Sequence, residues 1–261
     1  MATYTIYQVD AFTDKIFGGN PAAVVPLQQW LTTDVMQLIA AENNLSETVF
    51  FVPTDNGYHI RWFTPTVEIE LCGHATLAAA FVLFEILGVT TDTLSFQSLS
   101  GNLSVTRNND FITLNFPANE PKRIDAIEAL NIALGKAPME WYQNQDDSIA
   151  VYNSEADVAG LSPDFNALKK ISNHGVLATA ASTETDFISR CFYPAVGVNE
   201  DPVTGSAHTR LIPLWAGKLG KLKLSAKQIS KRGGYLTCEL AGSRVLMSGK
   251  AALYMKGEIY I

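Results

Sequence analysis

Two glycine turns carry the groups in this sequence that are best suited to hold a small anion and to move a proton. The first turn is Cys72-Gly73-His74-Ala75, and the second is Thr204-Gly205-Ser206-Ala207. Glycine lets the backbone approach a ligand closely, and free amides at the start of a helix can hold a carboxylate or a developing oxyanion. One such turn alone is more often structural, but two at matching positions favour a ligand site.

Two carboxylates near these turns are candidates for general acid–base catalysis. Glu47 lies in Ser46-Glu47-Thr48, directly before an apolar run, and Asp201 precedes the second glycine turn. A carboxylate in a dry cleft can have a raised pKa and can then shuttle protons. From spacing alone, two structural alternatives stay open: a solvated glutamate at the start of a strand for Glu47, and a helix-start histidine for His74.

Other reaction types lack their motifs in this chain. Thr204-Gly-Ser206-Ala-His208 lacks the second glycine of a serine-nucleophile turn. The segment Gly18-Gly19-Asn20-Pro21 leads into an apolar strand and not into the helix that a phosphate loop needs. Asn20 therefore suits a turn, with lining of the site as the alternative. The four histidines and three cysteines show no metal-ligand spacing, so we expect no metal, no disulfide framework, and buried structural thiols at Cys191 and Cys238.

Composition narrows the class of partner. The net charge of −7 and the pI near 5.1 disfavour binding of nucleic acid. No apolar run approaches the roughly 20 residues that span a membrane, and the first residues do not resemble a signal peptide. With 47% hydrophobic residues in 261, the chain can bury one large core or two ordinary ones. We therefore expect a cytoplasmic protein that binds neither nucleic acid nor membranes.

An internal repeat is the main structural signal. The segment LTTDVMQL from Leu31 recurs as LSPDFNAL from Leu161, and in each case a hydroxyl residue is suited to cap the helix. The segment RWFTP from Arg61 recurs as RCFYP from Arg190, at nearly the same offset. The Glu68-to-Ala75 and Glu200-to-Ala207 segments also match, again with an offset close to the first. This order predicts two similar lobes, residues 1–117 and 118–261, joined by a polar linker near 117–123, with the last strand able to cross back to the first lobe.

Each half reads as several strands with one prominent helix. The segment HATLAAAFVLFEIL from His74 is apolar nearly all round, so it predicts a helix that is buried on every side. Its counterpart from Ser206 is less apolar, and Pro213 predicts that it kinks or begins late. Strands are predicted in the first half by their β-branched and aromatic content: they are residues 4–9, 22–25, 48–52, 59–63, 94–97, 103–107 and 111–116.

The positions that break the repeat are the most informative. At the offset that places Leu31 on Leu161, Glu47 aligns with Leu177, so only one half has a carboxylate there. A duplicated scaffold is expected to place its site between the halves, and each half then brings different proton-handling groups to it. The other unequal pairs are Asp201 with Ile69, His74 with Ser206, and Cys72 with Thr204.

With these residues in view, the sequence resembles the phenazine-biosynthesis PhzF-like proteins, which share the fold of diaminopimelate epimerase. The resemblance rests on VDAFTDKIFGGNPAAVV, NNLSETVF, FTPTVEIELCGHATLA and NEDPVTGSAH, and it spans both halves. It implies an α+β fold of two pseudo-symmetric lobes, each a curled, mostly antiparallel, barrel-like sheet around a central helix. It also implies a homodimer without metal or organic cofactor, and an acid/base glutamate at Glu47.

The resemblance also predicts the composition of the site. Glu47, His74 and Asp201 are the expected catalytic residues. Residues expected to contact the substrate are Asn20, Ser46, Gly73, Thr204, Gly205 and Ser206. The related epimerases use a pair of cysteines, one at each glycine turn, whereas this chain has Cys72 at the first and Thr204 at the second. A two-thiol racemisation is therefore disfavoured, and Cys72 is expected to be a packing residue.

The leading hypothesis is a cofactor-independent isomerase that moves a proton on a small carboxylate, with Glu47 as the acid/base. The substrate is expected to be cyclic and to carry a hydroxyl or amino group. Two alternatives stay open: an epimerase or racemase of an amino or hydroxy acid with opposed bases, and a binding protein that keeps the cleft without turnover. The sequence names no substrate, because a scaffold can host many reactions.

Overall fold

The computed structural model describes residues 1–144, 147–172 and 174–261, and the chain forms two compact units. Unit 1 contains residues 1–116 and 246–261, and unit 2 contains residues 117–245. The α+β fold class predicted from the sequence is confirmed. In the described part of the chain, no helix is both long and apolar enough to cross a membrane.

Unit 1 is a curved sheet with two helices. Its strands are β1 (Thr3–Ala11), β2 (Asn20–Pro26), β3 (Glu47–Thr54), β4 (Gly57–Phe63), β5 (Glu68–Ile69), β6 (Thr93–Ser98), β7 (Gly101–Asn108), β8 (Phe111–Pro117) and β18 (Ala251–Tyr260). Helix α1 (Thr33–Asn43) connects β2 to β3, and α2 (Gly73–Phe81) follows β5. All seven strands predicted for the first half are present.

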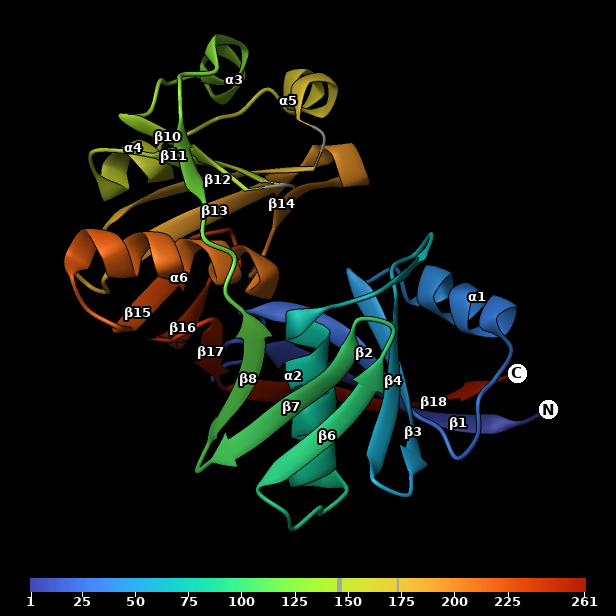
Figure 1. Cartoon of the computed structure of the whole chain (residues 1–261). Coiled ribbons are helices and arrows are strands. Elements are labelled where there is room, and N and C mark those ends of the chain that lie inside the picture. The colour runs from blue at the N-terminus through green and yellow to red at the C-terminus, as the bar shows by residue number, and fades with distance from the viewer. Residues whose placement is uncertain (145–146, 173) are drawn as a thin grey trace. The chain divides into compact units, whose positions relative to one another are not determined.

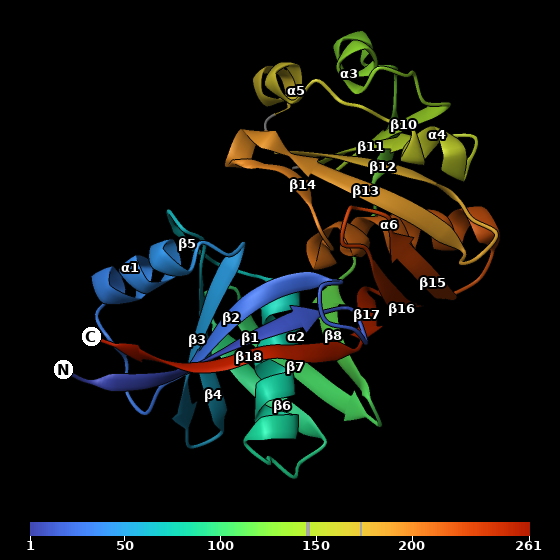
Figure 2. The same ribbon diagram turned by 180° about the vertical axis from the view of Figure 1, so that it is seen from behind.

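The central helix of unit 1 is enclosed by the sheet, as its composition predicts. Figures 1 and 2, seen from opposite sides, show α2 with β6, β7 and β8 on one side and β1, β2 and β18 on the other. Residues 73–80 are all buried. The chain then continues as a π-helical turn, Val82–Ile86, which the apolar pattern did not reveal. Because every side chain of such a helix packs against the sheet, the position of its first turn relative to the sheet is fixed.

Unit 2 repeats this architecture with additional helices. Its strands are β9 (Lys122–Ile124), β10 (Glu140–Gln143), β11 (Asp147–Val151), β12 (Gly175–Ala181), β13 (Phe187–Tyr193), β14 (Val198–Asp201), β15 (Lys223–Gln228), β16 (Gly234–Ala241) and β17 (Arg244–Gly249), which continues into unit 1. Its helices are α3 (Glu128–Leu134), α4 (Glu155–Ala159), α5 (Phe165–Ile171), α6 (Gly205–Leu219) and the 3₁₀ turn Pro194–Val196.

Strand pairing shows that the sequence repeat is a repeat of topology. In unit 1, β2–β3 and β4–β6 are parallel, whereas β1–β2, β3–β4, β4–β5 and β6–β7 are antiparallel. In unit 2, β11–β12 and β13–β15 are parallel, whereas β10–β11, β12–β13, β13–β14 and β15–β16 are antiparallel. The order of unit 2 is therefore that of unit 1 shifted by nine strands. In the same way, β18 pairs with β1 and β9 pairs with β10.

The sheet of unit 2 buries both of its faces. Figure 1 shows α3 and α5 on the side of β11–β13 that faces away from α6. On the α3–α5 side, Val176 and Ala178 of β12 belong to an apolar cluster with side chains from these helices. On the other side, the Thr179 hydroxyl accepts a hydrogen bond from Nε1 of Trp215 of α6, at 3.0 Å, and the Trp215 ring stacks on Phe187. This alternation is the period of two that a strand imposes.

Helix α6 corrects one prediction from the sequence. It begins at Gly205 and not late, and it continues through Pro213. A proline inside a helix leaves the carbonyl four residues earlier without its usual donor. Here that carbonyl, of Thr209, accepts the backbone N–H of Asn119 at 3.0 Å, and the Asn119 amide donates to the Thr209 hydroxyl at 3.1 Å. The segment after β8 therefore supplies the hydrogen bond that the proline removes.

Candidate functional site

The first glycine turn brings two of the predicted catalytic residues into contact. Glu47 begins β3, His74 lies in the first turn of α2, and Nε2 of His74 is 3.0 Å from Oε2 of Glu47. Both side chains are largely removed from solvent, with 6% of His74 and 15% of Glu47 exposed. An acid/base pair that is shielded from water but not sealed from it has the burial that proton transfer requires.

The other ring nitrogen of His74 faces two further residues. Nδ2 of Asn20, the buried first residue of β2, is 3.2 Å from Nδ1, and Sγ of Cys72 is 3.5 Å from it. An amide nitrogen can only donate, so while His74 is neutral its Nδ1 accepts and its Nε2 carries the proton toward Glu47. The prediction that Asn20 suits a turn is therefore wrong, because Asn20 is a strand residue with a partner in α2. Sequence alone does not reveal Cys72 as a neighbour of the imidazole.

Local charge favours a protonated His74. Burial acts to lower the pKa of His74, but Cys72 and Glu47 act in the opposite direction and hold that pKa well above its usual value. Burial raises the pKa of the Cys72 thiol, and the Glu47 carboxylate raises it further. The thiol is thus a poor base at neutral pH, whereas the imidazole keeps the proton that it shares with Glu47.

Glu47, Cys72 and His74 also have the side-chain types of a metal site, with candidate ligand atoms within 4.8 Å of one another. A single ion would need one nitrogen of His74 together with both other ligands. Glu47 contacts Nε2 and Cys72 contacts Nδ1, so each lies at a different ring nitrogen. A shared ion would have to replace one of these contacts, whereas proton transfer uses them as they lie.

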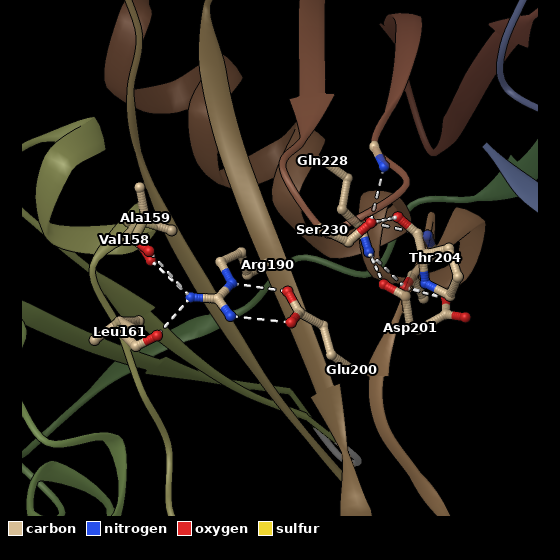
Figure 3. Close-up of polar contacts among 11 residues, drawn as sticks. Val158, Ala159, Leu161, Arg190, Glu200, Asp201, Thr204, Gln228 and Ser230 are labelled. Atoms are coloured by element: carbon tan, nitrogen blue, oxygen red, sulfur yellow. Dashed lines mark hydrogen bonds and ion pairs between the residues drawn. The ribbon is translucent and has the colours of Figure 1, made fainter. Parts of the chain in front are cut away.

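The second glycine turn is organised by a hydrogen-bonded chain that ends on Asp201 (Figure 3). Nε2 of the fully buried Gln228, at the end of β15, donates to the Thr204 hydroxyl at 3.2 Å and to the Asp201 carbonyl at 2.7 Å. Its Oε1 accepts the Thr204 backbone N–H at 2.9 Å. The Thr204 hydroxyl donates to Oδ2 of Asp201. Because the hydroxyl oxygen accepts the hydrogen bond from Gln228, its own proton is free to point to the Asp201 carboxylate.

This series of hydrogen bonds orients the Asp201 carboxylate, and it uses both the hydroxyl and the backbone N–H of Thr204. Thr204 was predicted to contact the substrate, but its hydroxyl and its backbone N–H both have partners within unit 2. Gly205 and Ser206 are the first residues of α6, and Ser206 is exposed. Gln228 lies far beyond Thr204 in the chain with no motif around it, so no sequence signal identifies it.

Both glycine-turn helices begin without a capping side chain. Neither Cys72 of α2 nor Thr204 of α6 forms a side-chain capping hydrogen bond. By contrast, α1, α4 and α5 are capped by Thr32, Ser154 and Asp164, whereas α3, with Ile127 at its start, is not capped. The first-turn amides of α2 and α6 therefore keep the positive end of the helix dipole free of a capping oxygen, as an anion site requires. The cap on α5 is Asp164 and not the hydroxyl residue Ser162 that the repeat predicted.

An arginine–glutamate pair lies next to each turn. Arg61 donates through Nε and Nη2 to both carboxylate oxygens of Glu68, each at 2.7 Å. Arg190 does the same with Glu200, at 2.7 and 2.9 Å, and Figure 3 shows it also reaching backbone carbonyls. These bidentate pairs fix β4 to β5 and β13 to β14, the strands that lead into the two glycine turns.

Strand register corrects the alignment of Glu47. Phe50 lies opposite Arg61, and Ala178 lies opposite Arg190. The counterpart of Glu47 is therefore Gly175, and the alignment with Leu177 was wrong because it ignored this register. A Cβ at Gly175 would lie 2.2 Å from a ring carbon of Tyr193, so this position has no room for a side chain. The alignment of Asp201 with Ile69 is confirmed, since they lie opposite Cys191 and Trp62.

The structure thus brings the predicted residues together in two groups, each within one unit. In unit 1, Asn20, Glu47 and His74 are in contact, with Ser46 and Gly73 beside them in the chain. In unit 2, Asp201 and Thr204 are in contact, and Gly205 and Ser206 follow. Cys191 and Cys238 are buried free thiols, as predicted.

Comparisons with known proteins agree with this architecture. Residues 9–257 match the family described as phenazine biosynthesis-like protein, PhzC-PhzF. An uncharacterized isomerase of Pseudomonas aeruginosa is 52% identical over 98% of this chain and 99% of its own. A phenazine biosynthesis-like domain-containing protein of Homo sapiens is 38% identical over 97% of this chain and 98% of its own.

Solved structures extend the likeness to the backbone. A PhzF-family protein of Enterococcus faecalis has a TM-score of 0.97 at 49% identity, and each chain covers 100% of the other. A hydroxyproline epimerase of Agrobacterium vitis, at 12% identity and a TM-score of 0.67, covers 98% of this chain and 92% of its own and shares the fold alone. The chain therefore belongs to the phenazine biosynthesis-like protein family, and it is an enzyme of the isomerase class.

Proposed function

We propose that this enzyme moves a proton between two positions of a small carboxylate, without a cofactor, and that Glu47 is its general acid/base. The substrate class is a small, cyclic carboxylate that carries a hydroxyl or amino group. In this proposal Glu47 and His74 of unit 1 carry the proton transfer, and Asp201 and Ser206 of unit 2 stay predicted contributors.

The observation that carries the proposal is the Glu47–His74 pair. Its atoms are 3.0 Å apart, it lies at the start of α2, and His74 has a raised pKa. A histidine that keeps its proton stabilises the neighbouring carboxylate in its charged form, which is the form that can accept a proton from carbon. The uncapped start of α2 supports the binding of a substrate carboxylate beside this pair.

The proposed reaction has two proton transfers. The Glu47 carboxylate takes a proton from one carbon of the substrate, and the electron pair left behind is delocalised toward the substrate carboxylate or an adjacent double bond. Glu47 then returns the proton to a second carbon on the same face. The first-turn amides of α2, which begins at Gly73, would stabilise the charge that develops on oxygen. His74 keeps the Glu47 carboxylate oriented in both steps.

A two-thiol mechanism has little support in this chain. The only cysteine at either turn is Cys72, and burial raises the pKa of its thiol. At the equivalent turn, the Thr204 hydroxyl is occupied by Gln228 and Asp201. A single carboxylate remains as the main base, which favours a shift on one face over inversion by two opposed bases.

Deuterium incorporation tests the proposal. The enzyme is incubated in deuterated water with a panel of small cyclic and acyclic amino and hydroxy carboxylates, and NMR follows deuterium in each compound. We expect incorporation into at least one compound with wild type and a loss of about 100-fold or more with Glu47→Gln, because the amide cannot accept the proton. Incorporation that is equal in the two proteins would reject Glu47 as the base.

The position of the label separates the isomerase from the epimerase. Deuterium at a new carbon, with a moved double bond, supports the proposed shift. Deuterium at the original carbon with inverted configuration supports an amino or hydroxy acid epimerase. Asp201→Asn is the matched variant for the second case, because an opposed base on unit 2 would be Asp201.

A further inference from the structure

The imidazole of His74 lies between two acids, each of which becomes a base once it has lost its proton. Nε2 of His74 is 3.0 Å from Oε2 of Glu47, and Nδ1 is 3.5 Å from Sγ of Cys72. His74 and Cys72 are buried and Glu47 is largely removed from solvent, so little water screens the three groups from one another. The acid that pairs with the ring therefore becomes the base of the site.

The Cys72 thiol shows this competition. Burial and the Glu47 carboxylate raise the pKa of Cys72, whereas its contact with His74 acts to lower that pKa. A thiolate paired with an imidazolium is the usual form of an activated cysteine, so a proton passed from Sγ to Nδ1 would turn Cys72 into the base. Which acid pairs with the ring therefore depends on what else contacts Nδ1.

Asn20 supplies a further contact to Nδ1. It is the fully buried first residue of β2, opposite Ala11 of β1, and its Nδ2 is 3.2 Å from Nδ1 of His74. Nδ1 has one lone pair in the plane of the ring, so an amide N–H that donates to it competes with the thiol proton for the same place. A proton on Nδ1 would also face the amide N–H. The Asn20 amide therefore directs the ring proton to Nε2, beside Glu47.

We propose that Asn20 is a positioning residue that selects Glu47 over Cys72 as the base. Its amide N–H keeps Nδ1 of His74 as an acceptor, so that the ring proton stays on Nε2 beside the carboxylate and the thiol stays neutral. Asn20 acts through His74 and not through the reacting atoms. This inference rests on the function proposed above, in which Glu47 is the acid/base.

NMR of the imidazole nitrogens tests the proposal without substrate. When the ring is titrated upward to its neutral form, wild type is expected to carry the proton on Nε2 and none on Nδ1. In Asn20→Asp a proton on Nδ1 is expected to persist to higher pH, because a carboxylate at that place accepts a hydrogen bond from Nδ1–H. His74→Gln identifies the signals of this ring. A neutral wild type with its proton on Nδ1, or the same titration in both proteins, would overturn the proposal.

Alkylation by iodoacetamide tests the state of the thiol. Asn20→Leu removes the amide donor at similar volume and leaves Nδ1 to accept the thiol proton. The rate at which iodoacetamide modifies Cys72 is therefore expected to rise by about tenfold or more over wild type, because the thiolate is the form that reacts. Mass spectrometry of the same digest follows Cys191 and Cys238, which are buried in unit 2 and report any general unfolding.

Asn20→Asp is the matched control for alkylation. Its carboxylate holds a proton on Nδ1, and its negative charge disfavours a thiolate nearby, so no faster modification of Cys72 is expected. Faster modification in neither variant, or an equal increase in both, would overturn the proposal. The tautomer of wild type decides the role of Asn20 even where a variant does not fold.

Turnover separates this proposal from the reaction on which it rests. With a compound that takes up deuterium, Asn20→Leu is expected to lower kcat by about tenfold or more and to leave KM within about twofold, as a residue that only positions the base should. An unchanged kcat would contradict the selection of Glu47 by Asn20. A wild type that labels no compound would count against the proposed reaction, whereas the tautomer and the alkylation rates would still decide the role of Asn20.

Discussion

At the scale of single residues, the two turns use opposite means to set their acidic groups. Glu47 is oriented by an imidazole that keeps its proton, whereas Asp201 is oriented by a neutral amide acting through a hydroxyl. The first arrangement can exchange a proton. The second arrangement only orients the Asp201 carboxylate, because neither Gln228 nor Thr204 titrates near neutral pH.

The Thr204 hydroxyl can be removed at nearly constant volume. Thr204→Val leaves Nε2 of Gln228 with one acceptor fewer and removes the hydroxyl that donates to Oδ2 of Asp201. We expect a loss of about 1–3 kcal/mol in the free energy of unfolding, measured by urea denaturation. Thr204→Ser keeps the hydroxyl and should stay within about 1 kcal/mol of wild type. Equal losses in the two variants would mean that the methyl group, and not the hydrogen bonds, stabilises the turn.

His208 gives the protein an acid sensitivity with a defined sign. Burial lowers the pKa of His208 to about 4, although its hydrogen bond to the Thr204 carbonyl, at 2.8 Å, acts to raise it. The unfolded chain binds a proton near pH 6.5, whereas the folded chain does not bind it until about pH 4. Stability from this group is therefore complete above pH 6.5 and falls as the pH drops toward 4.

The expected size of the His208 effect is about 3 kcal/mol over that window. His208→Asn keeps a donor for the Thr204 carbonyl but removes the titration. Urea unfolding of both proteins at several pH values between 7 and 4 should show a shallower decline for the variant. Parallel curves would place the acid sensitivity in other groups.

At the scale of elements, the arginine–glutamate pairs differ in what else they hold. Besides Glu68, Arg61 reaches the Thr33 hydroxyl. Besides Glu200, Arg190 reaches the carbonyl groups of the buried residues Leu161, at 2.7 Å, and Val158, at 3.2 Å. The second pair therefore also ties β13 to the last turn of α4 and to the chain that follows it.

Lysine in place of each arginine measures this difference. Lysine keeps the charge but cannot bond the carboxylate and the carbonyls together. We expect Arg190→Lys to lower the free energy of unfolding by about 1–3 kcal/mol, and Arg61→Lys to lower it by less. The paired urea curves are the measurement, and a larger loss at Arg61 would contradict the comparison.

The elements were more predictable from sequence than their contacts. The strands of the first half and the buried helix from His74 follow from local pattern, because period and composition are properties of neighbours in the chain. The late start of the Pro213 helix was wrong because Asn119, which is distant in the chain, supplies the missing donor. Gln228 was also missed because it is distant in the sequence from Thr204 and Asp201, the residues that it contacts. Glu47 was misaligned because strand register depends on pairing, which an ungapped offset ignores.

At the scale of the molecule, the chain order and the spatial order differ. Unit 2 is one continuous segment, whereas unit 1 needs both ends of the chain, because β1 pairs with β18. The two ends are joined by backbone hydrogen bonds between Ala2 and Ile261 at 2.6 and 2.9 Å. A short linker can therefore connect them without distorting either strand.

Fragments test this organisation. Residues 117–245 alone should unfold cooperatively in urea, and residues 1–116 alone should not, because β1 then lacks its long pairing with β18. A chain in which residues 246–261 precede residues 1–116, joined by a short Gly/Ser linker from Ile261 to Met1, should regain a cooperative transition. Cooperative folding of 1–116 without the strand would contradict the assignment.

Gly175 has a consequence for how such a duplicated chain can change over time. A side chain at this position would meet the Tyr193 ring at 2.2 Å and an oxygen of the buried Asp147 at 2.7 Å. A second Glu47 could therefore arise there only if both neighbours were replaced as well. Each of those steps taken alone would destabilise the core, so no single substitution restores symmetry. The difference between the halves at this position is therefore hard to reverse, because a carboxylate equivalent to Glu47 requires several coordinated substitutions in unit 2.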